Sequence, residues 1–221
     1  MATAVITGAN RGIGLELARQ LSGDFDIIGI CRRSSEELDA LGVRVEAGID
    51  ITQGQDLQRM AARLAGVSID LLINNAGLLR PSSLAGIEDE LDDWRAQFEV
   101  NALAPIRVTS ALREQLAEGG KVVIITSRMG SIADNDSGGA YAYRMSKSAV
   151  NSAGVSLAHE LKGRSIAVGL LHPGYVRTGM TGHTGHIDPD QAAAQLIERI
   201  HELDMRLTGS FRHANGESLP W

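Results

Sequence analysis

The sequence predicts a single α/β domain in which one doubly wound parallel sheet of about seven strands carries helices on both faces. Short apolar runs rich in β-branched residues alternate with stretches of helical period along almost the whole chain. Strands separated by helices pair in parallel, because each crossover returns the chain to the same edge of the sheet. No Pro-, Gly- or Ser-rich linker divides the 221 residues, so we expect residues 1–221 to form one domain.

The strands are expected where short apolar runs are bounded by turn residues. In chain order they are residues 2–7, 26–31, 43–47, 69–74, 121–126, 166–171 and 209–212. The unbroken apolar run Val122-Val123-Ile124-Ile125 is typical of a strand that is buried on both faces of a sheet.

Helices are expected between these strands, because apolar residues recur there with a helical period. The three clearest stripes are Ile13, Leu17, Ala18 and Leu21; Leu57, Met60, Ala61 and Leu64; and Ala193, Leu196, Ile197 and Ile200. The last helix has a defined start: Asp188 supplies the N-cap, Pro189 the first helical residue and Gln191 the third. The glycine-containing stretch 174–187 before it is expected to be a lid and not a domain boundary.

Composition and charge exclude several classes of protein. With 43% hydrophobic and 22% charged residues, the chain is close to the globular average. Its formal net charge is -6 and no basic run exceeds Arg32-Arg33, which argues against nucleic-acid binding. The single cysteine, Cys31, allows neither an internal disulfide nor a cysteine metal cage, and we expect no metal site. No stretch approaches the ~18 apolar residues of a membrane span, so we expect a soluble cytoplasmic protein.

A glycine-rich turn follows the first strand and leads directly into the first helix. It reads Gly8-Ala9-Asn10-Arg11-Gly12-Ile13-Gly14. The first backbone N–H groups of a helix are unpaired, and glycines let a pyrophosphate approach that positive end closely. The spacing departs from the common Gly-x-Gly-x-x-Gly pattern. We expect the turn to bind the phosphates of a dinucleotide, with a plain tight turn as the alternative.

The end of the second strand indicates which dinucleotide is preferred. An acidic residue there would bind a ribose 2'-hydroxyl, whereas a basic residue would accommodate a 2'-phosphate. The strand ends in Cys31-Arg32-Arg33, and Arg11 in the glycine turn can reach the same phosphate. We therefore expect NADP(H) rather than NAD(H). The alternative is that these arginines are solvated strand and loop ends.

Three polar side chains indicate acid-base chemistry. Tyr143 and Lys147 are four residues apart in a helical run, so they lie on one helix face. A positive charge ~4 Å away would lower the tyrosine pKa by roughly three units before desolvation opposes it. Ser127 follows the fifth strand at the carboxyl edge of the sheet, where ligands of doubly wound folds bind. Each feature alone is common: Tyr143 and Lys147 could be an exposed side-chain pair, and Ser127 could be an ordinary hydroxyl at a strand end. Together they predict acid-base catalysis on an alcohol or carbonyl.

With these motifs the sequence resembles the short-chain dehydrogenases/reductases, a Rossmann-fold family, over nearly its whole length. Thr7-Gly8-x-x-x-Gly12-x-Gly14 is similar to the cofactor turn of the family, and Asn74-Asn75-Ala76-Gly77 to its fourth-strand motif. The resemblance implies that Asp50 contacts the adenine and that Pro173-Gly174 with Thr178 lies by the nicotinamide. It also implies a catalytic tetrad of Asn101, Ser127, Tyr143 and Lys147. The expected cofactor site comprises Gly8, Asn10, Arg11, Gly12, Ile13, Gly14, Arg32, Arg33, Asp50, Ile51, Asn75, Ala76, Gly77, Tyr143, Lys147, Pro173, Gly174, Val176 and Thr178.

Residues 209–221 and 137–143 look like the C-factor and sniffer-type carbonyl reductase branch of the family. The chain departs from the family in having a short lid, which would leave the substrate pocket open. Sixteen positions separate Ser127 from Tyr143, more than in most members, and we place the surplus in a polar loop, 133–137, at the pocket mouth. Ser127 is preferred to Ser131 as the catalytic serine because Gly130 completes a Ser-x-x-Gly pattern with it.

The resemblance implies reversible hydride transfer between NADP(H) and a carbonyl or alcohol, with ketone or aldehyde reduction favoured. Tyr143 would exchange the proton and Ser127 would bind the substrate oxygen. Lys147 would hold the nicotinamide ribose and lower the pKa of Tyr143, while Asn101 would link Lys147 to water. The alternative is a dinucleotide-binding sensor or signalling protein with little turnover.

The expected partner is a small-molecule substrate, and neither nucleic acid nor a membrane. A nucleotide-sugar epimerase of the same superfamily is disfavoured, because the chain lacks room for a substrate domain. In many relatives the helices that begin near Glu88 and Tyr141 pair subunits, so the resemblance implies a homodimer or homotetramer. His183 follows Gly182 and His186 follows Gly185; these glycines oppose a helix, and the two histidines are not expected to bind a metal.

Overall fold

The computed structural model describes residues 1–221 and contains one sheet of seven strands. These strands are β1 (Ala2–Thr7), β2 (Phe25–Cys31), β3 (Arg44–Ala47), β4 (Ile69–Asn74), β5 (Leu116–Ile125), β6 (Ala167–His172) and β7 (Ser210–His213). They lie in the order β3-β2-β1-β4-β5-β6-β7, and every neighbouring pair is parallel. The expected doubly wound, Rossmann-type sheet is confirmed.

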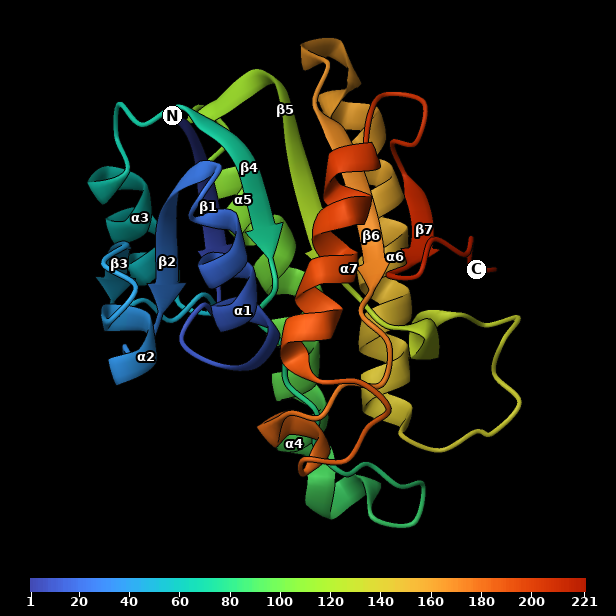
Figure 1. The fold of residues 1–221 in the computed structure, drawn as a ribbon. Coiled ribbons are helices and arrows are strands. Elements are labelled where there is room, and N and C mark those ends of the chain that lie inside the picture. Colours follow the sequence, from blue (N-terminus) through green and yellow to red (C-terminus); the bar gives the residue numbers. More distant parts are fainter.

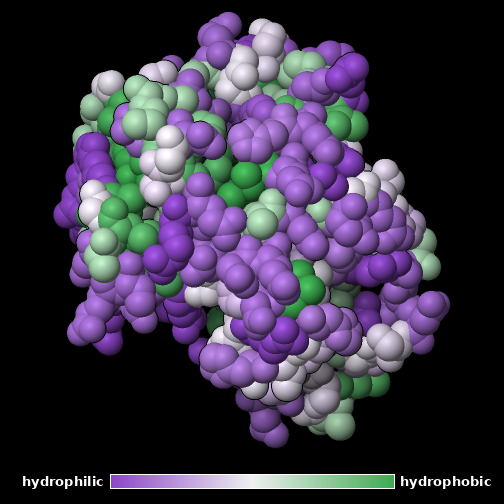
Figure 2. Space-filling model, in the orientation of Figure 1, coloured by the Kyte–Doolittle hydropathy of each residue, from purple (hydrophilic) through white to green (hydrophobic).

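Helices cover both faces of the sheet (Figure 1). They are α1 (Gly12–Leu21), α2 (Glu36–Asp39), α3 (Gly54–Arg63), α4 (Ile87–Phe98), α5 (Ala104–Ala111), α6 (Tyr141–Leu161) and α7 (Pro189–Glu202). Successive strand residues point to opposite faces, so Ile6 packs with Leu17 of α1 whereas Val5 packs in the core that contains Met60 of α3. The face that carries α1 and α7 is covered mainly by hydrophilic residues (Figure 2).

The strand bounds agree with the expected ones except in β5. Strands β1 and β4 are as predicted, β2 and β3 differ by one residue at one end, and β6 and β7 are shifted by one residue at both ends. Strand β5 begins at Leu116 and not at Lys121, because Leu116 pairs with Ile69 before a register shift. Glu118, Gly119 and Gly120 interrupt the apolar pattern there, so this pattern did not predict the first half of the strand.

Two helix starts bear on the site. Helix α6 begins at Tyr141, two residues before the expected reactive tyrosine. Helix α7 begins as expected, with Pro189 as its first residue and the Asp188 N–H donating to Gln191 Oε1 at 3.4 Å. Between α4 and α5 the chain forms a π-helical turn, Glu99–Leu103, which the sequence did not predict.

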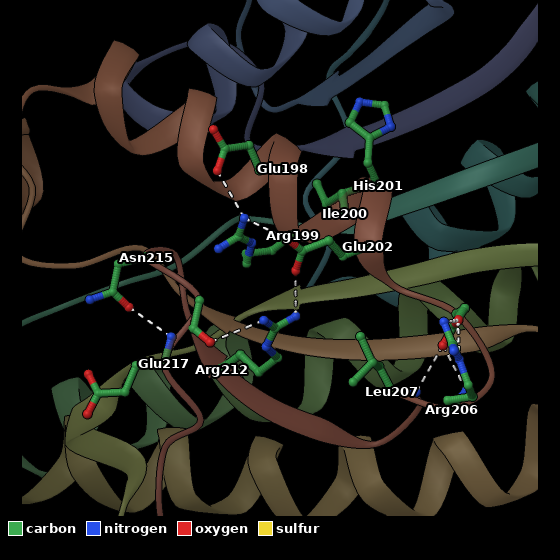
Figure 3. A network of polar contacts seen from close by, with 12 residues as sticks. Glu198, Arg199, Ile200, His201, Glu202, Arg206, Leu207, Arg212, Asn215 and Glu217 are labelled. Carbon is green, nitrogen blue, oxygen red and sulfur yellow. Dashed lines mark hydrogen bonds and ion pairs between the residues drawn. The ribbon is translucent and has the colours of Figure 1, made fainter.

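The last strand is held by charged contacts with the end of α7 (Figure 3). Arg212 donates to Glu202 at 2.9 Å, and Arg199 lies 2.8 Å from the same carboxylate. Arg212 also donates to the Gly216 carbonyl at 3.1 Å, so the turn after β7 is tied to the strand itself. None of the helices combines the length and the apolar character that crossing a membrane requires. No group of three or more His, Cys, Asp or Glu side chains is placed to hold a metal ion.

Candidate active site

The expected site residues gather at the carboxyl edge of the sheet, because parallel strands all end on the same side. Strands β1, β4, β5 and β6 lie next to one another, in this order, in the sheet. The glycine turn and Pro173 directly follow β1 and β6, the Asn74-Asn75-Ala76-Gly77 motif begins on the last residue of β4, and Ser127 lies two residues beyond β5. The segments 131–140 and 174–187 and helix α4 project beyond this edge (Figure 1).

Ser127 and Tyr143 lie together inside the protein, close enough for the serine hydroxyl to act on the pKa of the tyrosine. Tyr143 is 9% exposed and Ser127 is 6% exposed. The Ser127 Oγ accepts from the Met129 N–H at 3.1 Å, which orients the hydroxyl and leaves its proton free to be donated. Burial raises the pKa of Tyr143 to about 12, while the hydrogen bond with Ser127 acts in the opposite direction.

Gly130 explains why the two hydroxyls meet. It ends the short helical turn Arg128–Gly130 after Ser127, and this turn packs against the backbone of α6. A Cβ at Gly130 would lie 2.8 Å from the Lys147 carbonyl carbon and 2.9 Å from its oxygen. The Ser148 hydroxyl donates to the Gly130 carbonyl at 2.8 Å and holds the turn in place. The Ser-x-x-Gly pattern is therefore a packing requirement.

Lys147 lies one helical turn beyond Tyr143 and is only 4% exposed. Its Nζ donates to the Ile125 carbonyl at 2.9 Å and lies 5.7 Å from the centroid of the Tyr143 ring. Burial lowers the pKa of Lys147 to about 8. The expectation that Lys147 brings the Tyr143 pKa toward neutrality is wrong for the chain by itself, because burial of the phenol outweighs any effect of the ammonium group.

Asn101 lies in the π-helical turn, and its amide supports the loop after β4. It accepts from the Leu78 N–H at 2.8 Å and donates to the Leu78 carbonyl at 2.7 Å. It also donates to Ser146 Oγ at 3.1 Å, and Ser146 in turn donates to the Tyr143 carbonyl at 2.8 Å. The structure thus joins Asn101 to the helix that carries Tyr143, through Ser146.

The glycine turn packs tightly against the end of β4. Asn75 Nδ2 donates to the carbonyls of Thr7 at 3.0 Å and Gly8 at 3.3 Å. A Cβ at Gly14 would lie 2.2 Å from the Gly8 carbonyl oxygen, so only glycine fits. Helix α1 then begins with no side-chain cap and no acidic residue in its first turn. Its positive end is left free for an anion, which fits a dinucleotide pyrophosphate.

Three arginines beside this turn have no carboxylate partner. Arg11, Arg32 and Arg33 are exposed, and none of them takes part in any of the ion pairs in the structure. Arg11 has extended backbone immediately before α1, and Arg32 and Arg33 follow the last residue of β2. These guanidinium groups are free to bind an anionic group at this edge.

Most of the remaining expected cofactor residues lie in the segment after β3 or in the lid, and a few lie in the glycine turn and the β4 motif. Asp50 Oδ1 accepts from the Thr52 N–H at 3.0 Å and from its hydroxyl at 2.8 Å. Thr178 approaches the glycine turn, since its Cγ2 is 3.5 Å from a Cβ built at Gly12. Val176 is buried and forms a bridge with Ile187. Of the others, Pro173 is buried, while Asn10, Ile13, Ile51, Ala76, Gly77 and Gly174 are partly exposed.

The lid folds back on itself. The Tyr175 carbonyl accepts from the His186 N–H at 2.7 Å, and the Arg177 N–H donates to the Ile187 carbonyl at 2.9 Å. Arg177 also forms a bidentate ion pair with Asp188, at 2.7 and 3.1 Å. The glycine-containing stretch 174–187 is therefore held by backbone and ionic contacts at its base.

Sequence reasoning missed a cavity beside the site, because no motif marks the residues that line it. The cavity has a volume of about 540 Å³ and is lined by Leu79, Arg80, Pro81, Ser82, Ser83, Glu90, Ala140 and Met180. It adjoins the end of β4, since Met180 Cε is 3.4 Å from a Cβ built at Gly77. A second cavity, of about 190 Å³, lies at the opposite edge of the sheet around Asp70 and Lys121, away from this chemistry.

Comparison with known proteins agrees with this geometry. Residues 2–188 match the family model of the short chain dehydrogenases. Over 228 aligned positions that cover both chains fully, the sequence is 40% identical to a 1-hydroxy-2-glutathionyl-2-methyl-3-butene dehydrogenase of Rhodococcus sp. (strain AD45). It is 38% identical to the C-signal protein of Myxococcus xanthus over 167 positions, 75% of this chain and all of that one.

Among solved structures, a carbonyl reductase from Pseudomonas aeruginosa PAO1 in complex with NADP superimposes with a TM-score of 0.84 at 32% identity, covering all of both chains. The matches with this reductase and with C-signal confirm the expected branch. Sequence, fold and the joined Ser127, Tyr143 and Lys147 thus lead to one conclusion: the chain belongs to the short-chain dehydrogenases/reductases, a family of oxidoreductases.

Proposed function

We propose that the protein is an NADP(H)-dependent oxidoreductase that transfers hydride reversibly between the nicotinamide and a carbonyl or alcohol, with ketone or aldehyde reduction favoured. The observation that carries the proposal is the buried Ser127–Tyr143 pair, with Lys147 beneath it, next to an uncapped glycine turn. The Pseudomonas carbonyl reductase was solved in complex with NADP, and the Rhodococcus relative is named for an alcohol substrate, which supports both halves of the proposal.

When bound, the nicotinamide supplies or accepts the hydride. The chain handles the proton and the developing charge. With a pKa of about 12, Tyr143 is protonated at neutral pH and can donate its proton to a carbonyl oxygen. Ser127 lies beside it and can donate a hydrogen bond to the same oxygen as negative charge develops there. The Lys147 ammonium, close to the Tyr143 ring, stabilises the tyrosinate that remains.

The residues of the cofactor site fit NADP(H). The glycine turn and the first N–H groups of α1 would hold the pyrophosphate, and Arg11, Arg32 and Arg33 the 2'-phosphate. Asp50 and Ile51 would contact the adenine, while Asn75, Ala76 and Gly77 would line the middle of the site. Lys147 would hold the nicotinamide ribose, and Pro173, Gly174, Val176 and Thr178 would lie by the nicotinamide.

The proposal is tested by mixing purified protein with NADPH and a panel of ketones, aldehydes and quinones while absorbance at 340 nm is followed. Turnover is expected, and Tyr143→Phe and Ser127→Ala should each lower kcat by at least about 100-fold, the usual size of a general acid-base contribution. Ser131→Ala is the matched control, because Ser131 caps the Asp134 N–H and should leave most activity intact. Unchanged activity in Tyr143→Phe would overturn the assignment.

The alternative, a dinucleotide-binding sensor or signalling protein, is based on the similarity to C-signal. It is not favoured, because a sensor has no use for Ser127, Tyr143 and Lys147 held together. The relative that matches the whole length of the chain is named as a dehydrogenase. Binding of NADPH without turnover over the full substrate panel would favour the sensor instead.

We further propose that residues 1–221 act as one cytoplasmic domain that binds a small-molecule substrate, and neither nucleic acid nor a membrane. The continuity of the seven-stranded sheet supports a single domain. A homodimer or homotetramer formed through α4 and α6 is part of this proposal, and it is supported by exposed apolar side chains on that layer, Leu103 and Met145.

A further inference from the structure

The helix that carries Tyr143 and Lys147 begins without a cap of its own. The residue before α6, Ala140, has no polar side chain, and its backbone is left-handed, with φ 45° and ψ 44°. The first N–H groups of a helix have no partner within the helix and need an outside acceptor or water. Tyr143 is only the third residue of α6, so it lies in the turn that is most prone to fraying.

Ser82 supplies the missing cap from a distant part of the chain. Its Oγ accepts from the Ala142 N–H at 3.1 Å, although the two residues are 60 positions apart. Of the first three N–H groups of α6, that of Ala142 alone has a protein acceptor. A serine hydroxyl is one of the best acceptors for this position of a helix.

The loop that carries Ser82 is itself anchored on both sides of the serine. Asn101 binds both backbone groups of Leu78, and Gln97 Oε1 accepts from the Arg80 N–H at 3.2 Å. After the serine, Glu90 accepts from the Ser83 N–H at 2.7 Å. Because α4 and the π-helical turn hold the loop at these points, Ser82 is a fixed acceptor and not a mobile one.

The contact between Ser82 and α6 lies at the wall of the cavity beside the site. Ser82 and Ala140 both line this cavity, as does Met180 of the lid. A substrate in the cavity would shield the contact between Ser82 and Ala142 from water, and a shielded hydrogen bond is stronger. The same contact therefore connects the substrate cavity to the turn that holds the Tyr143 hydroxyl against Ser127.

We propose that Ser82 is a positioning residue, which caps α6 from the β4–α4 loop and thereby holds Tyr143 at Ser127. The inference rests on the proposed function for its kinetic consequence, but the cap itself does not depend on turnover. Loss of the hydroxyl frays the first turn of α6 and reduces the fraction of molecules in which the two hydroxyls are aligned.

The test compares Ser82→Ala, Ser82→Thr and the control Ser156→Ala, whose serine is exposed later on α6 and bonds only the Ser152 carbonyl. Ser82→Ala should lower kcat roughly 3- to 10-fold, as expected for loss of a helix cap, and leave the KM for NADPH within about 2-fold. Ser82→Thr keeps a hydroxyl and should restore most of kcat. A general loss of stability would lower the apparent kcat through the active fraction and would also leave KM unchanged, so kcat is expressed per NADPH-binding site, titrated in each variant.

Amide hydrogen exchange on the intact protein gives a readout without turnover. Exchange at residues 141–145 should increase in Ser82→Ala and stay unchanged in Ser156→Ala. Unchanged exchange in Ser82→Ala overturns the proposal, and so does increased exchange with wild-type kcat. If the wild-type protein shows no turnover, the proposed function fails, and the exchange result alone still decides whether Ser82 holds the turn that carries Tyr143.

Discussion

At the scale of single residues, burial dominates the chemistry of the site. Burial raises the pKa of Tyr143 and lowers that of Lys147, because each charged form loses its hydration. Both residues therefore favour their neutral forms more than they would in water. A phenol that keeps its proton at neutral pH is suited to act as an acid, which agrees with carbonyl reduction as the favoured direction.

The buried lysine makes a prediction for stability. Between pH 8 and 10 the unfolded chain keeps a proton on Lys147 that the folded chain has lost, so this group makes the free energy of unfolding rise with pH. The rise is at most ~1.4 kcal/mol per pH unit. Lys147→Met should lack this contribution. Urea unfolding of both proteins without cofactor, at pH 7.5 and 9.5, measures it, and an identical pH dependence in the two would contradict the assignment.

The unpaired arginines make a prediction for the cofactor. Replacing Arg32 and Arg33 with glutamate should weaken NADPH binding by roughly 10-fold or more, since a charge-assisted hydrogen bond contributes ~1.5–3 kcal/mol. NADH lacks the 2'-phosphate, so its affinity should change far less. Fluorescence titration with both cofactors measures the difference, with the double change Arg19→Glu and Arg95→Glu, at exposed arginines of α1 and α4, as a control of equal net charge. An equal loss for both cofactors would argue against 2'-phosphate recognition.

At the scale of elements, close packing of backbones brings the reacting groups together. The turn Arg128–Gly130 meets α6 where only a glycine fits, and the glycine turn after β1 meets the end of β4 in the same way. In both contacts the glycine has no side chain, which lets two backbone segments approach each other directly. The glycines of this chain thus determine how its polar side chains are placed.

Gly130→Ala tests this packing. The added Cβ would press on the backbone of Lys147, so the turn must move away from α6 and carry Ser127 with it. We expect kcat to fall at least about 10-fold, with a stability loss of ~1–3 kcal/mol typical of overpacking. Gly163→Ala is the matched control, because a Cβ there meets nothing within 4 Å. Steady-state kinetics and thermal unfolding measure both, and wild-type kcat in Gly130→Ala would refute the packing argument.

At the scale of the whole molecule, the order of the strands determines where the site lies. The chain crosses from β3 back to β4 beside β1, which places the glycine turn and the β4 motif on neighbouring strands. Helix α4 packs on α6 outside the core of the sheet, and Trp94 and Tyr141 stack there with ring centroids 5.9 Å apart. Met145 of α6 is 48% exposed, and Leu103, in the π-helical turn that follows α4, is 49% exposed.

These exposed apolar side chains make a prediction for assembly. If α4 and α6 pair two copies of the chain, Met145→Glu should shift the protein toward monomer, because a charge at the centre of an apolar contact is costly to bury. Light scattering after size-exclusion chromatography, over a range of concentrations, measures the effect. A mass of one chain for the wild-type protein at every concentration would exclude the proposed dimer.

Local patterns in the sequence were sufficient for the sheet and for most of the site. The alternation of strands and helices depends on hydropathy within short windows, and every predicted strand is present. Local pattern failed where an element is stabilised by distant contacts. The first half of β5 is polar and rich in glycine and is a strand only because Leu116 pairs with Ile69. The π-helical turn around Asn101 likewise has no local signature.

The sequence by itself determined the fold class, the family and the residues that meet at the carboxyl edge, because motif order and parallel pairing depend on the covalent chain. Only the tertiary structure decided how those residues act on one another. It showed that burial raises the pKa of Tyr143, that Asn101 binds Leu78 and Ser146, and that Ser82 caps α6. Burial and contacts between distant segments arise from packing in three dimensions, which spacing along the chain does not encode.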